Sequence, residues 1–132
     1  KLISGSMPAC PKIHMGYIDV RDVARAHVFS MTEDKTNGER IIVSENEMFF
    51  AEVGKTLNEA GFKKSPTKEM PNFLVRIMSL FIGELKGLLP ALSRKGDIDK
   101  TKAKNFFDWD YISTEQSVTE TAQQLEDMGL TK

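Results

Sequence analysis

The sequence is poor in the residue types that build metal sites and disulfides. Its 132 residues include one cysteine, Cys10, and two histidines, His14 and His27. A single cysteine excludes an internal disulfide and a multi-cysteine zinc site, and the histidines have no cysteine or carboxylate partner at ligand spacing. We therefore expect no metal site, and the low cysteine content favours a reducing, cytoplasmic compartment.

Charge of one sign and long hydrophobic runs are also lacking. Lys and Arg total 18 against 19 Asp and Glu, which leaves a net charge of −1 and no reason to expect a nucleic-acid or membrane partner. The most apolar window, residues 73–83, is far shorter than the roughly 20 residues of a membrane span, so we interpret it as a buried helix. The chain starts at Lys1 without a methionine or a signal peptide, which favours a piece of a longer protein.

Catalytic motifs are equally sparse. The sequence contains no glycine-rich dinucleotide fingerprint, no phosphate-binding P-loop and no Gly-x-Ser-x-Gly nucleophile elbow. Cys10 lies between Ala9 and Pro11 and is interpreted as a loop thiol rather than a nucleophile. Asp19 and Asp22 are interpreted as helix caps rather than as an acid–base pair. No residue of this chain is therefore assigned a catalytic role.

Hydrophobic periodicity predicts two short strands and about five helices. The strands are expected over 17–20 and 39–43, and the helices over 20–31, 50–60, 72–82, 97–104 and 113–128, with an interrupted segment over 84–94. The first helix places its apolar residues and His27 on one face, which we expect to be buried. A capping box from Ser44 to Glu47 is expected to start the second helix, and a left-handed Gly129 to close the last one.

The strand over 39–43 needs more of a sheet than this chain supplies. Ile41, Ile42 and Val43 are apolar on both faces, which is typical of a buried strand. Two short strands do not form a stable sheet alone. We expect sequence outside this chain to supply the rest of the sheet, or else self-association through this strand and the apolar helix over 72–82.

Three runs, in the same order along the chain, resemble extended short-chain dehydrogenases/reductases. Residues 17–27, Tyr-Ile-Asp-Val-Arg-Asp-Val-Ala-Arg-Ala-His, resemble the stretch of that family that ends a strand and starts a helix. Residues 37–44 resemble its Gly-Glu-Arg-Tyr-Ile strand, and residues 125–130 are similar to its C-terminal helix. Within the family, the chain is most similar to the dihydroflavonol-4-reductase-like group of NAD(P)-dependent epimerases/dehydratases.

This resemblance implies an α/β, Rossmann-type fold in which residues 1–132 form a single, mostly helical C-terminal substrate-binding lobe. The N-terminal dinucleotide-binding domain, with the family's glycine motif, catalytic Ser/Thr and Tyr-x-x-x-Lys pair, lies upstream and is absent from this chain. Tyr17 is followed four residues later by Arg21, and Tyr111 by Glu115, so neither forms that pair. The implied cofactor is NAD or NADP in the full-length protein, and this chain alone is expected to bind no cofactor and to be inactive.

The same resemblance implies that the loop over 5–16 and the helices over 72–92 face the substrate. The candidate substrate-binding residues are Pro8, Met15, Tyr17, Met78 and Phe81. Met78 and Phe81 lie three positions apart, so a single helical face brings both to an apolar pocket, although core packing explains the same spacing. The implied function is reduction of a small aldehyde or ketone.

Two alternatives stay open at this point. The first is a nucleotide-sugar epimerase or dehydratase; such family members often carry an arginine just before the aromatic residue, where this chain has His14, Met15 and Gly16, which favours a carbonyl reductase. The second is a non-enzymatic helical interaction module, in which the apolar helix over 72–82 is a partner surface.

Overall fold

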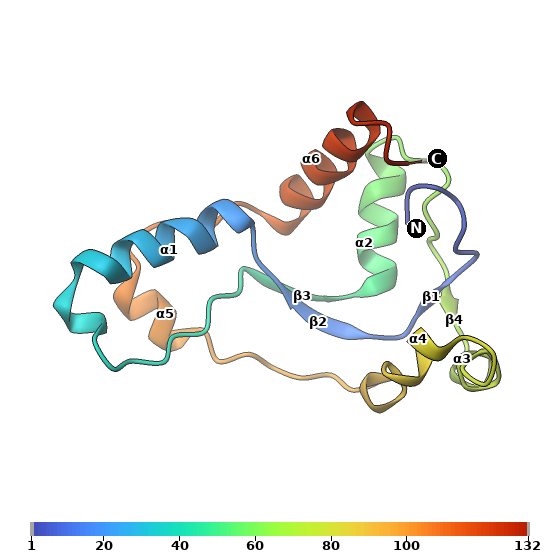
Figure 1. Ribbon diagram of the computed structural model, residues 1–132, viewed down its shortest axis with the longest axis horizontal. Helices are drawn as coiled ribbons and strands as arrows, with labels where there is room; N and C mark the ends of the chain where they lie inside the picture. The colour runs from blue at the N-terminus through green and yellow to red at the C-terminus, as the bar shows by residue number, and fades with distance from the viewer. Residues whose placement is uncertain (1, 132) are drawn as a thin grey trace.

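Helices are spread along the whole length of an elongated molecule, with short strands near its centre (Figure 1). The computed structural model describes residues 2–131, with the side chain of Glu84 outside that description. The α-helices are α1 (Val20–Thr32), α2 (Phe50–Glu59), α3 (Asn72–Met78), α4 (Gly83–Lys86), α5 (Thr101–Phe106) and α6 (Thr114–Asp127). Two short 3₁₀ helices span Asp34–Thr36 and Leu89–Ala91.

The described strands pair in twos. Strand β2 (His14–Tyr17) runs antiparallel to β3 (Asn46–Phe49), with His14 opposite Phe49 and Tyr17 opposite Asn46. Strand β1 (Cys10–Pro11) runs parallel to β4 (Glu69–Met70). Instead of the two strands expected from the sequence, the described part of the chain forms four, two of 4 residues and two of 2 residues, while the α/β class is confirmed.

Two hydrophobic clusters hold the helices in place. In the middle of the molecule, α2 packs on α6 and β3, and the buried residues of this cluster are Met48, Val53, Leu57 and Ala122. At one end, α1 packs on α5 around Ala26, Ala103 and Phe107. Figure 1 shows α3 and α4 at the opposite end of the molecule. Among the described residues, no helix is both long and apolar enough to span a membrane.

The strand expected over 39–43 is wrong. Residues 39–44 have no assigned secondary structure, and the strand forms over β3, where a capping box had been expected. The buried Ser44 hydroxyl donates to the carbonyl oxygens of Tyr17 and Asn46 at 3.4 and 3.3 Å, so it ties the strand pair instead of capping a helix. Helix α2 starts later, where the Phe49 N–H donates to the Glu52 carboxylate at 2.6 Å.

The expected buried face of α1 is also wrong. The residues that α1 buries are Asp22 and Ala26, whereas Val20 and Met31 are 77% and 84% exposed. Helix α1 turns the small Ala26 toward α5 because two helices approach closely only over small side chains. His27 lies on the exposed side, with Nδ1 2.8 Å from the Val23 carbonyl oxygen, and is not a core residue.

Helix ends follow the expected chemistry. Gly129 has φ of 71°, and the Leu130 N–H donates to the Leu125 carbonyl at 2.9 Å, which is the Schellman ending expected from the sequence. Gly61 ends α2 in the same way, with φ of 111° and a 3.0 Å bond from the Phe62 N–H to the Leu57 carbonyl. These left-handed positions favour glycine because it carries no Cβ.

Candidate functional site

An apolar cavity of about 430 Å³ lies beside α3 and α4. One wall comes from the N-terminal segment, one from the α3–α4 region, and Phe50 and Met70 complete the lining. The lining residues are Ser6, Met7, Pro8, Ala9, Pro11, Ile13, Met15, Phe50, Met70, Val75, Met78, Ile82, Leu85 and Leu88. A mostly apolar cavity of this size is typical of a site for a small organic ligand.

The chemistry of the lining is uniform. Ser6 contributes the one polar side chain among the lining residues, and none of them is charged. Four of the chain's 7 methionines line the cavity: Met7, Met15, Met70 and Met78. Methionine is flexible and polarisable, so such a wall adapts to apolar ligands of different shapes.

Backbone pairing fixes the walls of the cavity. The parallel pairing of β1 with β4 places Pro11 beside Met70. The Phe50 N–H donates to the Ile13 carbonyl at 2.9 Å, which brings the first residue of α2 to the same cavity. Val75 of α3 is fully buried and lines the same space.

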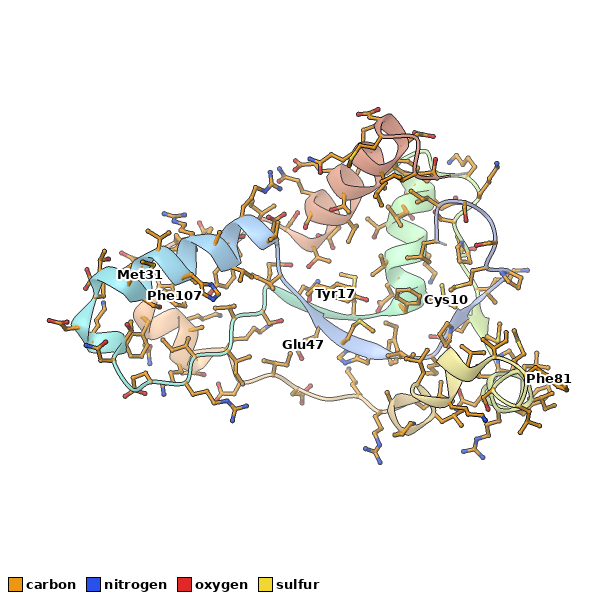
Figure 2. All side chains as sticks on the ribbon, viewed as in Figure 1. Cys10, Tyr17, Met31, Glu47, Phe81 and Phe107 are labelled. Atoms are coloured by element: carbon orange, nitrogen blue, oxygen red, sulfur yellow. The ribbon has the colours of Figure 1, made fainter. Side chains whose placement is uncertain are left out.

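The structure brings three of the five candidate residues together. Pro8, Met15 and Met78 all line the cavity, and both segments expected to face substrate contribute to it. Tyr17 lies instead against the central cluster, packed on the buried residues of α2, α6 and β3. Phe81 is 85% exposed and projects from the end of the molecule (Figure 2).

The placement of Phe81 has a simple cause. The helix expected over 72–82 ends at Met78, so Phe81 no longer shares a helical face with it. The Ile82 N–H then donates to the Met78 carbonyl at 2.9 Å and the chain turns into α4. This turn brings Ile82, Leu85 and Leu88 to the cavity, and the sequence pattern alone did not identify them.

The described residues place neither a metal-ligand cluster nor a reactive thiol at the cavity. Among residues 2–131, no three His, Cys, Asp or Glu side chains gather as a metal site. Cys10 is fully buried, its Sγ lies 3.7 Å from the Pro66 carbonyl oxygen, and burial raises the pKa of its thiol. A thiol held protonated in this way is a packing group rather than a nucleophile.

The two aspartates near the start of α1 have structural roles. Asp19 caps α1, accepting from the Arg21 N–H at 2.8 Å, and it also binds the Arg21 guanidinium, which reaches Glu120 of α6 at 2.7 Å. The hydrogen bonds from Arg21 hold the pKa of Asp19 well below its usual value. Asp22 is buried and accepts from the Ile112 N–H at 2.7 Å, so it anchors the chain before α6.

Two solved Gre2 structures, both in complex with NADPH, share this fold. The yeast methylglyoxal/isovaleraldehyde reductase Gre2, complexed with NADPH, matches 96% of this chain and 38% of its own, with a TM-score of 0.70 and 26% identity. This relative is a reductase whose structure holds NADPH. Gre2 from Candida albicans in complex with NADPH matches 96% of this chain and 35% of its own, with a TM-score of 0.66, and at 21% identity this likeness shows the fold alone.

Sequence relatives agree with the structural ones. The NADPH-dependent methylglyoxal reductase Gre2 of Saccharomyces cerevisiae is 28% identical over 115 residues, which is 87% of this chain and 30% of the relative. An uncharacterized oxidoreductase of Schizosaccharomyces pombe is 39% identical over 72 residues, 54% of this chain and 18% of the relative. The chain thus spans between 18% and 38% of the length of these relatives, and no family model matches it.

Proposed function

We propose that this chain forms the substrate-binding portion of an NADPH-dependent reductase of small, neutral aldehydes or ketones. The apolar cavity carries the proposal, because both segments expected to face substrate line it. The remainder of such an enzyme supplies the dinucleotide-binding domain, the cofactor and the catalytic groups. The finer proposal, a dihydroflavonol-4-reductase-like enzyme, rests on the resemblance carried together by residues 17–27, 37–44 and 125–130.

The cavity chemistry supports a neutral substrate. A nucleotide sugar carries a charged diphosphate, which proteins bind with Arg, Lys or arrays of backbone N–H groups. The cavity lining contains no Arg or Lys. The helices in its wall have 7 and 4 residues, so they are too short to offer a diphosphate a strong N-terminal array of backbone N–H groups. These observations disfavour the epimerase or dehydratase alternative and support an apolar carbonyl compound.

A second surface supports a partner domain. Residues 40–43 have no assigned secondary structure and make no backbone hydrogen bond with any described residue, although Ile41 and Val43 pack on the α1–α5 cluster. An open backbone edge of this kind pairs readily with another strand. It packs on the α1–α5 end of the molecule, where Met31 of α1 is 84% exposed, so strand pairing and apolar burial are available to one partner (Figure 2).

We infer that the partner is the remaining portion of the same enzyme, since the chain covers only 30% of its methylglyoxal reductase relative. In the alternative, a second copy of this chain covers the same surface. Sedimentation of the 132-residue chain separates the two, because a second copy as partner gives concentration-dependent dimers. Coexpression with the upstream coding region then shows whether the remainder binds and replaces the self-associated form.

Methionine methyl groups provide a direct test of the cavity. The chain is labelled with ¹³C at the methionine methyls and titrated with 4-methyl-2-pentanone, a neutral branched ketone. We expect saturable shifts for the four cavity methionines and none for Met31, Met48 or Met128, which do not line the cavity. Uniform shifts, or none, refute the proposed substrate pocket.

Calorimetry tests the absence of a cofactor site on this portion. The sequence has no glycine-rich turn of the kind that holds a dinucleotide pyrophosphate at a helix start, so we expect no heat of binding with NADPH. Micromolar NADPH binding by the 132-residue chain contradicts the division of roles proposed here.

A further inference from the structure

Residues 72–92 form a segment, called the excursion below, that leaves the rest of the molecule and returns to the same place, so that its two ends lie side by side. The chain enters it directly after β4, which pairs with β1. It leaves where Leu92 bridges Ile13 and where the Ser93 N–H donates to the Lys12 carbonyl oxygen at 2.8 Å. Both ends are therefore tied to the same short stretch, residues 10–13.

A side-chain bond joins the ends to each other. Asn72, the first residue of α3, donates from Nδ2 to the Ser93 hydroxyl at 2.8 Å, across 21 positions of sequence. Ser93 has φ of 58°, a left-handed conformation that serine seldom adopts. The backbone thus holds the hydroxyl at the point where the excursion closes.

The excursion carries one complete wall of the apolar cavity. Its inward residues are Val75, Met78, Ile82, Leu85 and Leu88. Its internal hydrogen bonds are local, such as the 2.7 Å bond from the Ser79 hydroxyl to the Arg76 carbonyl. Among the side chains that the structure describes, the polar ties between this segment and the rest of the molecule lie at its two ends.

We propose that residues 72–92 move as one flap over the apolar cavity, and that Asn72 and Ser93 are positioning residues that hold it closed. The inference rests on the proposed function, because the cavity under the flap is the substrate site assigned above. A wall held by apolar contacts and by ties at its ends opens when the tie at one end breaks. Without the Asn72–Ser93 bond, the start of α3 is free to leave Ser93, whose N–H stays bonded to the Lys12 carbonyl. The Asn72–Ser93 bond then opposes entry to the cavity and favours retention of a bound ligand.

Hydrogen exchange measures flap opening directly. A neutral hydrogen bond contributes modestly, so its loss is expected to speed amide exchange over 74–86 by roughly threefold in both Asn72→Ala and Ser93→Gly. Exchange in α2 and α6 is expected to stay unchanged. Ser93→Gly keeps the N–H bond to Lys12 and suits the positive φ, so it tests the hydroxyl even where Asn72→Ala fails to fold.

Three further variants sharpen the test. Asn72→Asp, unlike Asn72→Ala, is expected to keep amide exchange over 74–86 at the wild-type rate, because its carboxylate accepts a hydrogen bond from the Ser93 hydroxyl. The double variant Asn72→Ala/Ser93→Gly exchanges no faster than either single variant, since both remove the same bond. Asn105→Ala, an exposed asparagine on α5 far from the flap, leaves exchange over 74–86 at the wild-type rate.

The ketone titration separates this inference from the proposed function. Saturating 4-methyl-2-pentanone is expected to slow exchange over 74–86 in the wild-type chain. If the ketone shifts the methyl signals of the cavity methionines but neither Asn72→Ala nor Ser93→Gly changes amide exchange over 74–86, the flap is refuted and the proposed function stands. Faster exchange throughout α2 and α6 also refutes a positioning role. A wild-type cavity that does not respond to the ketone refutes the proposed function instead.

Discussion

Gly54 lies where helix α2 crosses the segment that leads to β4. It is buried, and a Cβ at this position would overlap the backbone carbonyl oxygen of Pro66 and lie 3.6 Å from the Cys10 Sγ. Replacing glycine by alanine inside a helix normally adds about 1 kcal/mol of stability. Here the overlapping atom belongs to the backbone, so the helix and the segment must separate, and overpacking of this kind costs about 1–3 kcal/mol or more.

We therefore expect Gly54→Ala to lower the free energy of unfolding by about 2 kcal/mol, measured by urea denaturation followed by circular dichroism. Gly83→Ala is the matched control, because a Cβ there meets no atom within 4 Å, and it is expected to stay within about 0.5 kcal/mol of wild type. The Met70 methyl signal should move in Gly54→Ala alone, since β4 shifts with the segment. Equal stability of the two variants refutes the close approach described here.

Three other substitutions test buried polar groups. Tyr17→Phe should raise the free energy of unfolding by about 1 kcal/mol, because the Tyr17 hydroxyl is buried without a partner among described residues. Burial raises the pKa of Tyr17 to about 12, so the folded state resists loss of the Tyr17 proton. In alkaline denaturation series wild type, unlike the variant, should therefore lose stability between the usual pKa of 10.0 and that value. Asp19→Asn should cost about 2 kcal/mol at pH 7; because the folded pKa is lowered, the difference from wild type should shrink as titration falls below pH 4. Asp22→Ala should cost about 2 kcal/mol by leaving the Ile112 N–H unpaired, and an unchanged melting curve contradicts that role.

Local signals in the sequence predicted the elements that local chemistry determines. Helix α6 begins after Ser113, whose side chain accepts from the Gln116 N–H, and ends at a left-handed Gly129. Helix α2 buries Val53 and Leu57 as its period indicates. These features depend on neighbours within a few residues, so a single sequence specifies them.

Features that depend on distant contacts were not predictable in the same way. Residues 39–43 have strand propensity, but a strand also needs a hydrogen-bonding partner, and the described residues provide none there. The apolar stripe of α1 predicted the wrong buried face, because the period of a helix does not say which face meets α5. The segments over 5–16 and 72–92 both line one apolar cavity, and the turn after Met78 decides which residues of the second segment reach it.

The four methionines of the cavity make its polarity sensitive to oxidation. A peroxide transfers one oxygen atom to a thioether sulfur, which leaves a polar, chiral sulfoxide where an apolar group stood. Met15 is the best placed to react first among them, since it is the one that is exposed. Each sulfoxide introduces a hydrogen-bond acceptor into a wall that otherwise offers only the Ser6 hydroxyl, so an oxidised chain presents a wetter surface to any hydrophobic ligand.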